Sequence, residues 1–78
     1  PLAQSIVEFC DRSAMEVQNY KNVLGKGVSG EIYGITYYIG NHGFMPEYLN
    51  VQNVDEKYEG QTVIYFASDI EFIGVFAI

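Results

Sequence analysis

The chain has 78 residues, of which 49% are hydrophobic and 18% are charged, and its formal net charge is −6. This length and composition fit one small globular domain and exclude a disordered chain, and the four basic residues exclude an extended nucleic-acid surface. The single cysteine, Cys10, excludes an internal disulfide and a zinc site built from several thiolates. No stretch reaches the length of about 18–20 apolar residues that a membrane-spanning helix needs, and we see no signal peptide.

Residues 1–14 are predicted to form an amphipathic helix. Pro1 suits a first helical position, where its missing N–H costs nothing. Apolar residues then recur at intervals of three and four: Leu2, Ala3, Ile6, Val7, Cys10 and Ala14. Because the chain starts without Met and stops at Ile78 within an apolar run, we expect it to be a piece of a longer protein.

The next segments have strand patterns. Residues 16–24 predict a strand, with Val17, Tyr20 and Val23 as its apolar positions. Residues 29–39 alternate more clearly, and the Gly34 position predicts a hairpin turn within them.

Residues 42–59 are predicted to contain short helical turns, one beginning near Pro46, and Gly60 is expected to end them. Two strong strand patterns follow, at residues 61–67 and 70–78, with a hairpin at Ser68–Asp69. Their nearly continuous apolar character predicts central strands that are covered on both faces.

The order of these elements predicts an α+β fold: an antiparallel sheet of about five strands flanked by helices, in a single domain that spans residues 1–78. We find no internal repeat, linker or low-complexity segment. Function must therefore be sought in local motifs.

The most informative motif is the glycine-rich stretch 25–41, GKGVSGEIYGITYYIGN, which holds five of the eight glycines. Gly25, Gly27 and Gly30 satisfy G-x-G-x-x-G, but a dinucleotide-binding fold needs a helix after these glycines. Here a strand pattern follows, which argues against that fold. Gly30 and Gly34 are interpreted as structural glycines.

A second interpretation is the glycine-rich loop of protein kinases, which VLGKGVSGEIYG resembles. That loop also lies between two strands. However, residues 35–39 contain no phosphate-binding lysine, the best helix precedes the loop, and no HRD or DFG sequence is present. A kinase fragment is therefore a less favoured alternative.

The whole chain resembles the nucleotide-binding (N) domain of heavy-metal-transporting (P1B-type) P-type ATPases. The resemblance rests on PLAQSIVEF, GKGVSG, YYIGN, GQTVIYFA and IGVFAI, which follow the order and spacing of that family's motifs over nearly all residues. Each motif is weak alone, but five in the right order are specific. The YYIG run favours zinc-, cadmium- or lead-type pumps over copper-type pumps.

The resemblance implies an ATP site at Gly25, Gly27, Gly40 and Asn41, with Val28 as an apolar wall near the base. Glycines without Cβ atoms allow close approach of the backbone, and the Asn41 amide offers donors and an acceptor. In the complete pump, ATP with Mg would be presented to an aspartate of the phosphorylation domain. The chain would then be a cytoplasmic domain of an integral membrane protein.

Several parts of that family's machinery would lie outside this chain. The family's histidine should stand just before Pro1, and the phosphorylated aspartate, the actuator domain and the metal ligands belong elsewhere in such a pump. We therefore expect a partial N-domain, incomplete at its N-terminus, that binds nucleotide weakly and lacks catalytic residues and a metal site. We also expect self-association of the truncated piece, without nucleic-acid or direct membrane contact.

Other polar residues receive simpler interpretations. His42 is expected to face solvent, and Lys26 is either a phosphate contact or an exposed turn residue. The acids Asp55, Glu56 and Glu59 are predicted to form a solvated helix face. The alternative from another functional class is a small non-catalytic interaction module whose glycines serve only in turns.

Overall fold

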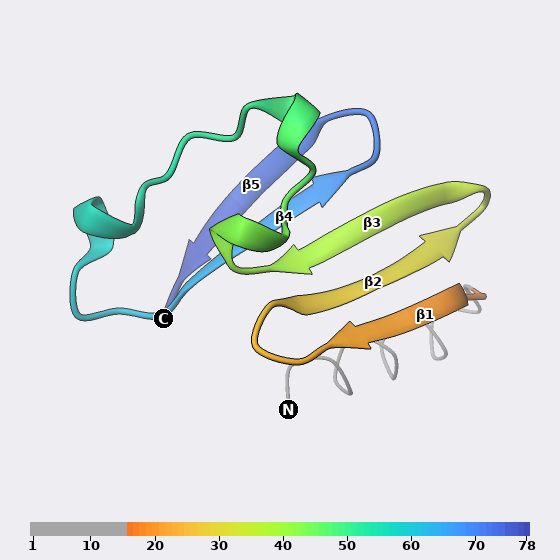
Figure 1. Cartoon of the computed structure of the whole chain (residues 1–78), viewed down its shortest axis with the longest axis horizontal. Coiled ribbons are helices and arrows are strands. Elements are labelled where there is room, and N and C mark those ends of the chain that lie inside the picture. The colour runs from red at the N-terminus through yellow and green to blue at the C-terminus, as the bar shows by residue number, and fades with distance from the viewer. Residues whose placement is uncertain (1–15) are drawn as a thin grey trace.

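The computed structural model describes residues 16–78, which form one open, antiparallel sheet of five strands (Figure 1). The strands are β1 (Gln18–Val23), β2 (Gly27–Ile32), β3 (Ile35–Gly40), β4 (Val63–Ser68) and β5 (Phe72–Ala77). Their spatial order is their chain order, so each strand pairs with its neighbour in sequence. The predicted five-stranded antiparallel sheet is confirmed, whereas the helix predicted over residues 1–14 lies outside the described residues.

The predicted hairpin at Gly34 is present between β2 and β3. Ile32 pairs with Ile35, which leaves Tyr33 and Gly34 as a two-residue loop. Both loop residues have positive φ, 51° and 80° respectively. Two successive positive φ angles suit the right-handed twist of the flanking strands, and glycine adopts them most easily.

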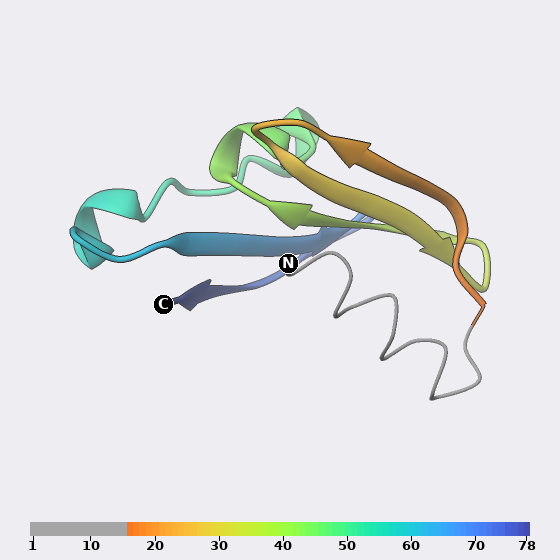
Figure 2. The same cartoon turned by 90° about the horizontal axis from the view of Figure 1, so that it is seen from below.

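The connection from β3 to β4 contains three short 3-10 helices: η1 (His42–Phe44), η2 (Glu47–Leu49) and η3 (Asp55–Tyr58). The short helix predicted after Pro46 is therefore present, and Gly60, at φ 83°, follows the last turn as expected. Figure 2 shows all three helices on the same side of the sheet. We call that side the covered face. In the described part of the chain, helices thus flank one face only, and all of them are 3-10 helices.

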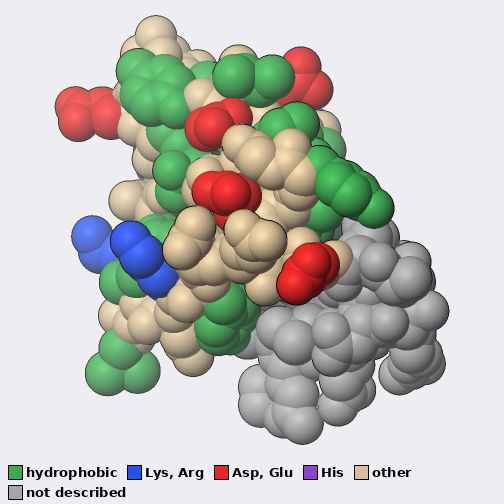
Figure 3. Space-filling model, turned by 90° about the vertical axis from the view of Figure 1, so that its right-hand side faces the viewer, with side chains coloured by type: hydrophobic (Ala, Val, Ile, Leu, Met, Phe, Trp, Pro, Cys, Tyr) green, Lys and Arg blue, Asp and Glu red, His purple; other side chains and the backbone are tan. Residues whose placement is uncertain are grey.

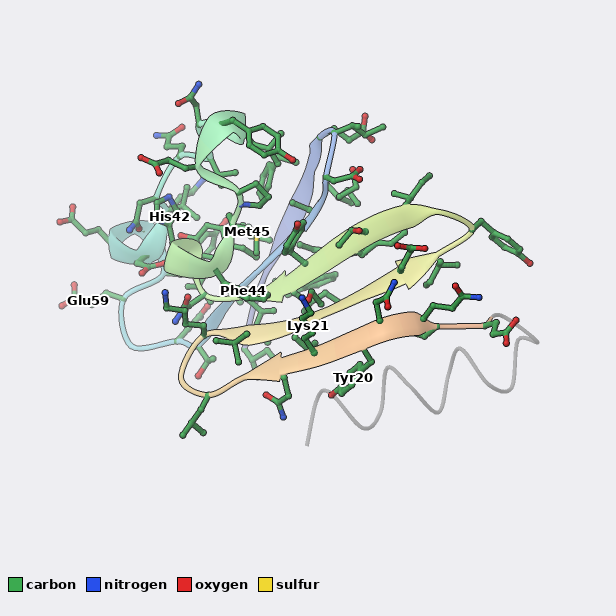
Figure 4. All side chains as sticks on the ribbon, turned by 45° about the vertical axis from the view of Figure 1, so that its right-hand side comes forward. Tyr20, Lys21, His42, Phe44, Met45 and Glu59 are labelled. Carbon is green, nitrogen blue, oxygen red and sulfur yellow. The ribbon has the colours of Figure 1, made fainter. Side chains whose placement is uncertain are left out.

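The hydrophobic core lies between the covered face and this connection. Tyr65 and Ala67 of β4 are fully buried. Met45, the residue after η1, is also buried and packs in the same cluster. Figure 4 shows His42, Phe44 and Met45 gathered above the sheet, while Tyr20 projects from β1. Partly buried side chains complete the cluster: Tyr38, Phe44, Leu49, Val51, Val54, Val63 and Val75.

The hydroxyl of Tyr65 ties the connection to the core. It donates a hydrogen bond to Asp55 Oδ1 at 2.6 Å and accepts one from the Val54 N–H at 2.9 Å. Burial, and then the hydrogen bond to Asp55, raises the pKa of Tyr65 above its usual 10.0. The neutral phenol is therefore the form that holds η3 against the sheet.

His42 packs against Tyr65 of this cluster, so the prediction that it faces solvent is wrong. Its ring is half-buried and lies edge-on to the Tyr65 ring, with 5.4 Å between the ring centroids. Its Nε2 donates to the carbonyl of Val51 at 2.6 Å. The aromatic neighbour and the carbonyl become available only when the connection folds over β4, which sequence spacing does not reveal.

The prediction that both C-terminal strands are central is wrong for β5. β4 pairs with β3 and β5, but within residues 16–78 β5 pairs only with β4 and lies at the edge of the sheet. Several of its apolar side chains are exposed, namely Phe72, Ile73 and Phe76. An apolar run indicates a strand, but it does not say how many neighbours that strand has.

The turn between β4 and β5 lies at Ser68–Asp69, as predicted. Ser68 Oγ accepts hydrogen bonds from the N–H groups of Ile70 and Glu71, at 3.2 and 3.1 Å. A serine side chain that bonds the backbone two or three residues ahead stabilises a tight turn. The hairpin is thus fixed by local hydrogen bonds.

Candidate functional site

The predicted site residues Gly25, Gly27, Gly40 and Asn41 converge at one corner of the sheet. We call them, together with Lys26, the glycine corner. Gly25 and Lys26 lie in the turn from β1 to β2, where the Lys26 N–H donates to the Val23 carbonyl at 3.0 Å. Gly40 ends β3 and Asn41 directly follows it, and both lie alongside this turn because Gly27 pairs with Gly40. Two segments that are 16 residues apart in sequence thus form one structure.

Asn41 holds the two segments together with two hydrogen bonds. Its side-chain Nδ2 donates to the Gly25 carbonyl at 2.8 Å, and its backbone N–H donates to the Lys26 carbonyl at 2.8 Å. Both bonds reach the same turn, so they fix its position against the end of β3. Asn41 therefore acts as a clamp within the protein, with one side-chain donor already engaged.

Gly27 and Gly40 lack side chains for a reason internal to the sheet. A Cβ atom on Gly27 would lie 2.2 Å from the Ile39 carbonyl oxygen, and one on Gly40 would lie 2.1 Å from the Lys26 carbonyl oxygen. Opposite residues approach most closely in the non-hydrogen-bonded pairs of an antiparallel ladder, and here the two backbones come closer still. The sheet itself requires glycine at both positions.

Gly25 is glycine for a different reason. Its φ angle is 77°, which other residues rarely adopt, but a Cβ atom there would meet nothing within 4 Å. Its outer side is open. The space around Gly25, and not that around Gly27 or Gly40, is where another molecule could approach the backbone.

The exposed groups at the glycine corner are suited to binding rather than to catalysis. Lys26 and Asn41 are exposed and offer an ammonium group and an amide, which hydrogen-bond to anionic or sugar oxygens. Leu24, at 99% exposure, adds an apolar surface beside them. Leu24 was not among the predicted site residues, although a large apolar residue directly before a Gly-x-Gly turn is a signal for it. The corner contains no acid and no nucleophile.

Val28 lies next to the glycine corner but points away from it. Because side chains alternate along a strand, Val28 projects from the face opposite to that of Gly27. It is only 8% exposed and pairs with Ile39 of β3. The expected contact between Val28 and a base stays a prediction, and the structure gives the side chain a packing role.

The other polar residues do not join the corner. Asp55, Glu56 and Glu59 are exposed in or beside η3, as predicted, but Asp55 also accepts the hydrogen bond from the buried Tyr65 hydroxyl and so does not only face solvent. In the face that Figure 3 shows, acidic side chains are separated by hydrophobic and uncharged groups. Within residues 16–78, no group of three or more His, Cys, Asp or Glu side chains could hold a metal ion. The same residues contain no helix that is long and apolar enough to cross a membrane.

Comparison with known proteins shows similarity over the whole chain to metal-transporting ATPases. No family model matches the chain. It is 29% identical to the "Probable cadmium-transporting ATPase" of Staphylococcus aureus strain MRSA252 and 29% identical to the "Copper-exporting P-type ATPase B" of Archaeoglobus fulgidus. It is also 29% identical to the "Cadmium/zinc-transporting ATPase HMA3" of Oryza sativa subsp. japonica.

All of this chain takes part in each of these three alignments, but the aligned region is 12%, 12% and 9% of the respective relatives. The chain thus spans about one tenth of the length of the curated relatives it matches. The similarity supports a part of a heavy-metal P-type ATPase.

Proposed function

We propose that this chain is the ATP-binding part of a heavy-metal-transporting P-type ATPase, a partial N-domain that presents ATP to an aspartate located outside it. The single observation that carries the proposal is the convergence of the Gly-x-Gly turn and the Gly-Asn pair at one corner. The similarity to metal-transporting ATPases over the whole chain supports the same assignment.

In this proposal, the exposed groups of the corner bind the nucleotide. The ammonium group of Lys26 and the free positions of the Asn41 amide contact phosphate or ribose oxygens, and the open side of Gly25 admits them to the backbone. Gly27 and Gly40 act indirectly, because their bare backbones allow β2 and β3 to approach until the Asn41 clamp forms. ATP, with Mg in the complete pump, supplies the γ-phosphate that the distant aspartate receives.

We also propose where in the pump this chain lies and which type of ion the pump transports. The chain would be a cytoplasmic domain of an integral membrane pump, next to its phosphorylation and actuator domains. Its cargo would be a cation of the zinc, cadmium or lead type. The YYIG run and the cadmium named in two of the three relatives above favour this cargo over copper.

A second candidate function is a non-catalytic interaction module. One observation favours it: the backbone contacts at Gly27 and Gly40 explain both glycines without any ligand. In the first function, the open side of Gly25 and the amide of Asn41 contact a nucleotide, and in the second function they do not. Nucleotide titration therefore distinguishes the two functions.

The test is an NMR titration of the 78-residue chain with ATP and with ADP, each with and without Mg. We expect the amides of Gly25, Lys26, Gly27, Gly40 and Asn41 to shift together. Lys26→Ala should weaken binding about threefold to tenfold, or about 1 kcal/mol, since it removes one exposed charge contact. Lys21→Ala is the matched control, because Lys21 is an exposed lysine of β1 outside the corner.

Two results would contradict the proposal. The first is the absence of any clustered response at millimolar ATP, which would favour the interaction module. The second is an equal loss of binding in the Lys26 and Lys21 variants, which would indicate attraction of the nucleotide by general charge rather than by a site.

A further inference from the structure

Asn41 stands at the start of a helix but does not cap that helix with its side chain. It is the N-cap residue of η1, where an asparagine side chain usually accepts a hydrogen bond from the first N–H groups of the helix. Here no such bond forms, and the Asn41 amide donates instead to the Gly25 carbonyl of the glycine corner. Its backbone carbonyl serves η1 by accepting the Phe44 N–H at 3.0 Å. The start of η1 therefore needs another anchor.

His42, the next residue, supplies that anchor. Its Nε2–H donates to the Val51 carbonyl at 2.6 Å, and this bond closes the segment that contains η1 and η2 into a loop. Since a carbonyl oxygen can only accept, the ring must carry a proton on Nε2. The ring also lies edge-on against Tyr65, above the sheet in Figure 4, with 5.4 Å between the ring centroids. His42 thus joins the start of η1 to the hydrophobic core.

The position of His42 connects the core to the glycine corner. Tyr65 is the register partner of Gly40, so the ring that His42 contacts belongs to the strand position beside the corner. Asn41 lies between Gly40 and His42, and both neighbours are held in place. Gly40 is held by its pairing with β2 and β4, and His42 by its two side-chain contacts. A residue that is fixed on both sides loses little further freedom when its side chain bonds to the turn, so the Asn41 clamp is preorganised.

We propose that His42 is a positioning residue for the nucleotide site, an inference that rests on the proposed function. His42 does not contact the ligand, but its bond to Val51 holds Asn41 in the orientation in which the glycine corner binds. If the anchored His42 favours nucleotide binding, then bound nucleotide favours the anchored His42 to the same degree. ATP at the corner should therefore change the surroundings of the His42 ring as well as those of the corner itself.

ATP titration of three single variants of the 78-residue chain tests this role. His42→Phe keeps an aromatic ring against Tyr65 but removes the donor, so its dissociation constant for ATP should rise about threefold to tenfold. His42→Gln places an amide donor near the position of Nε2, so its dissociation constant should stay within about twofold of that of the unaltered chain. Tyr65→Phe is the matched control. It removes the hydroxyl that bonds Asp55 and Val54 further along the same connection, and it should leave the affinity unchanged.

The histidine ring provides a direct NMR readout, because the sequence contains a single histidine. During ATP titration of the unaltered chain, the His42 ring signals should move with the same midpoint as the amides of Gly25 and Lys26. Without nucleotide, His42→Phe should shift these two amides in the same direction as Asn41→Ala does, because both changes loosen the clamp. The two amides should keep their positions in Tyr65→Phe.

The possible outcomes separate this inference from the proposed function. If the unaltered chain shows no clustered response to ATP, the proposed function is wrong, while shifted Gly25 and Lys26 amides in nucleotide-free His42→Phe would still support His42 as the residue that positions the corner. Unmoved amides in that variant would overturn the inference. It would also be overturned if ATP binds but His42→Phe and Tyr65→Phe weaken binding equally, or if His42→Gln binds as weakly as His42→Phe.

Discussion

Gly27, Gly40, Tyr65 and Val75 are consecutive register partners in one row across β2, β3, β4 and β5. The first two have no side chains, and a Cβ atom on either would strike the opposite strand. The third carries the largest fully buried side chain among the described residues, and the fourth packs against the core around it. We call Gly27 and Gly40 the bare half of the row, and Tyr65 and Val75 the packed half.

One row of the sheet thus serves two purposes. In the packed half, a large ring fills the space under the 3-10 helices and thereby anchors the connection. In the bare half, two backbones lie so close that the neighbouring turn and the end of β3 meet, and Asn41 can reach the Gly25 carbonyl. Stability is concentrated at one end of the row and the candidate binding groups at the other.

The largest loss of folding stability is expected from Tyr65→Ala, which removes the central side chain of the packed half. Removal of a fully buried aromatic side chain typically costs about 3–5 kcal/mol. That is a large part of the roughly 5–15 kcal/mol available to a folded domain, so urea unfolding followed by circular dichroism should show a variant that is largely unfolded. Tyr33→Ala removes an exposed tyrosine, and it should change the stability by about 0.5 kcal/mol or less.

A smaller but still large loss of folding stability is expected from Gly40→Ala, which adds a side chain to the bare half. The new Cβ atom meets the backbone of Lys26 and Gly27, so β2 and β3 must separate, at a cost of about 1–3 kcal/mol. Gly74→Ala is the control, since that position is open, and it should be neutral or stabilising. Unfolding midpoints measured at low protein concentration should differ between the two variants, and equal midpoints would contradict the backbone contact.

Asn41→Ala should loosen the link between the turn and β3 without disturbing the packed half. The lost hydrogen bond to the Gly25 carbonyl is exposed, so the cost should be about 0.5–1.5 kcal/mol. In NMR spectra without nucleotide, the amides of Gly25 and Lys26 should shift while those of β4 stay in place. Asn22→Ala, at an exposed asparagine of β1, should leave the turn unchanged. Shifts spread over the whole sheet would argue against a local clamp.

The smallest expected effect concerns pH. Folding raises the pKa of Tyr65, so the unfolded chain loses that proton first as pH rises. This contribution is therefore fully present below pH 10.0 and declines as pH rises through the pKa of the folded state. Tyr65→Phe should reduce the alkaline loss of stability, measured by urea unfolding from neutral to strongly alkaline pH. The slope that remains includes Tyr48, whose pKa is also raised.

Much of the local structure could be predicted from the residues because local rules determine it. The alternation in residues 29–39 and the glycine at 34 predicted a hairpin, and positive φ at Tyr33 and Gly34 explains the turn. Gly60 and Ser68–Asp69 likewise mark the ends of segments. The part of the predicted site that depends on sequence neighbours, the turn at Gly25, is present with the positive φ that favours glycine.

Other predictions depended on contacts between residues that are far apart in the sequence, and some of these predictions were wrong. The apolar run at residues 70–78 suggested a central strand, yet β5 lies at an edge within the described part of the chain. His42 was expected in solvent and instead packs against Tyr65. In both cases, the outcome depends on which segment the chain places alongside, a matter of topology and not of local pattern.

The sequence by itself determined the strands, their turns and the presence of two glycine motifs, because backbone preferences and hydrophobic period act over a few residues. Only the tertiary structure decided that the motifs meet. The pairing of Gly27 with Gly40 brings Asn41 to Gly25. The same pairing leaves no room for a Cβ atom at Gly27 or Gly40, and the spacing of residues in the sequence does not reveal this requirement. The physical cause is close packing: the fit of two backbones depends on atoms that are far apart along the chain.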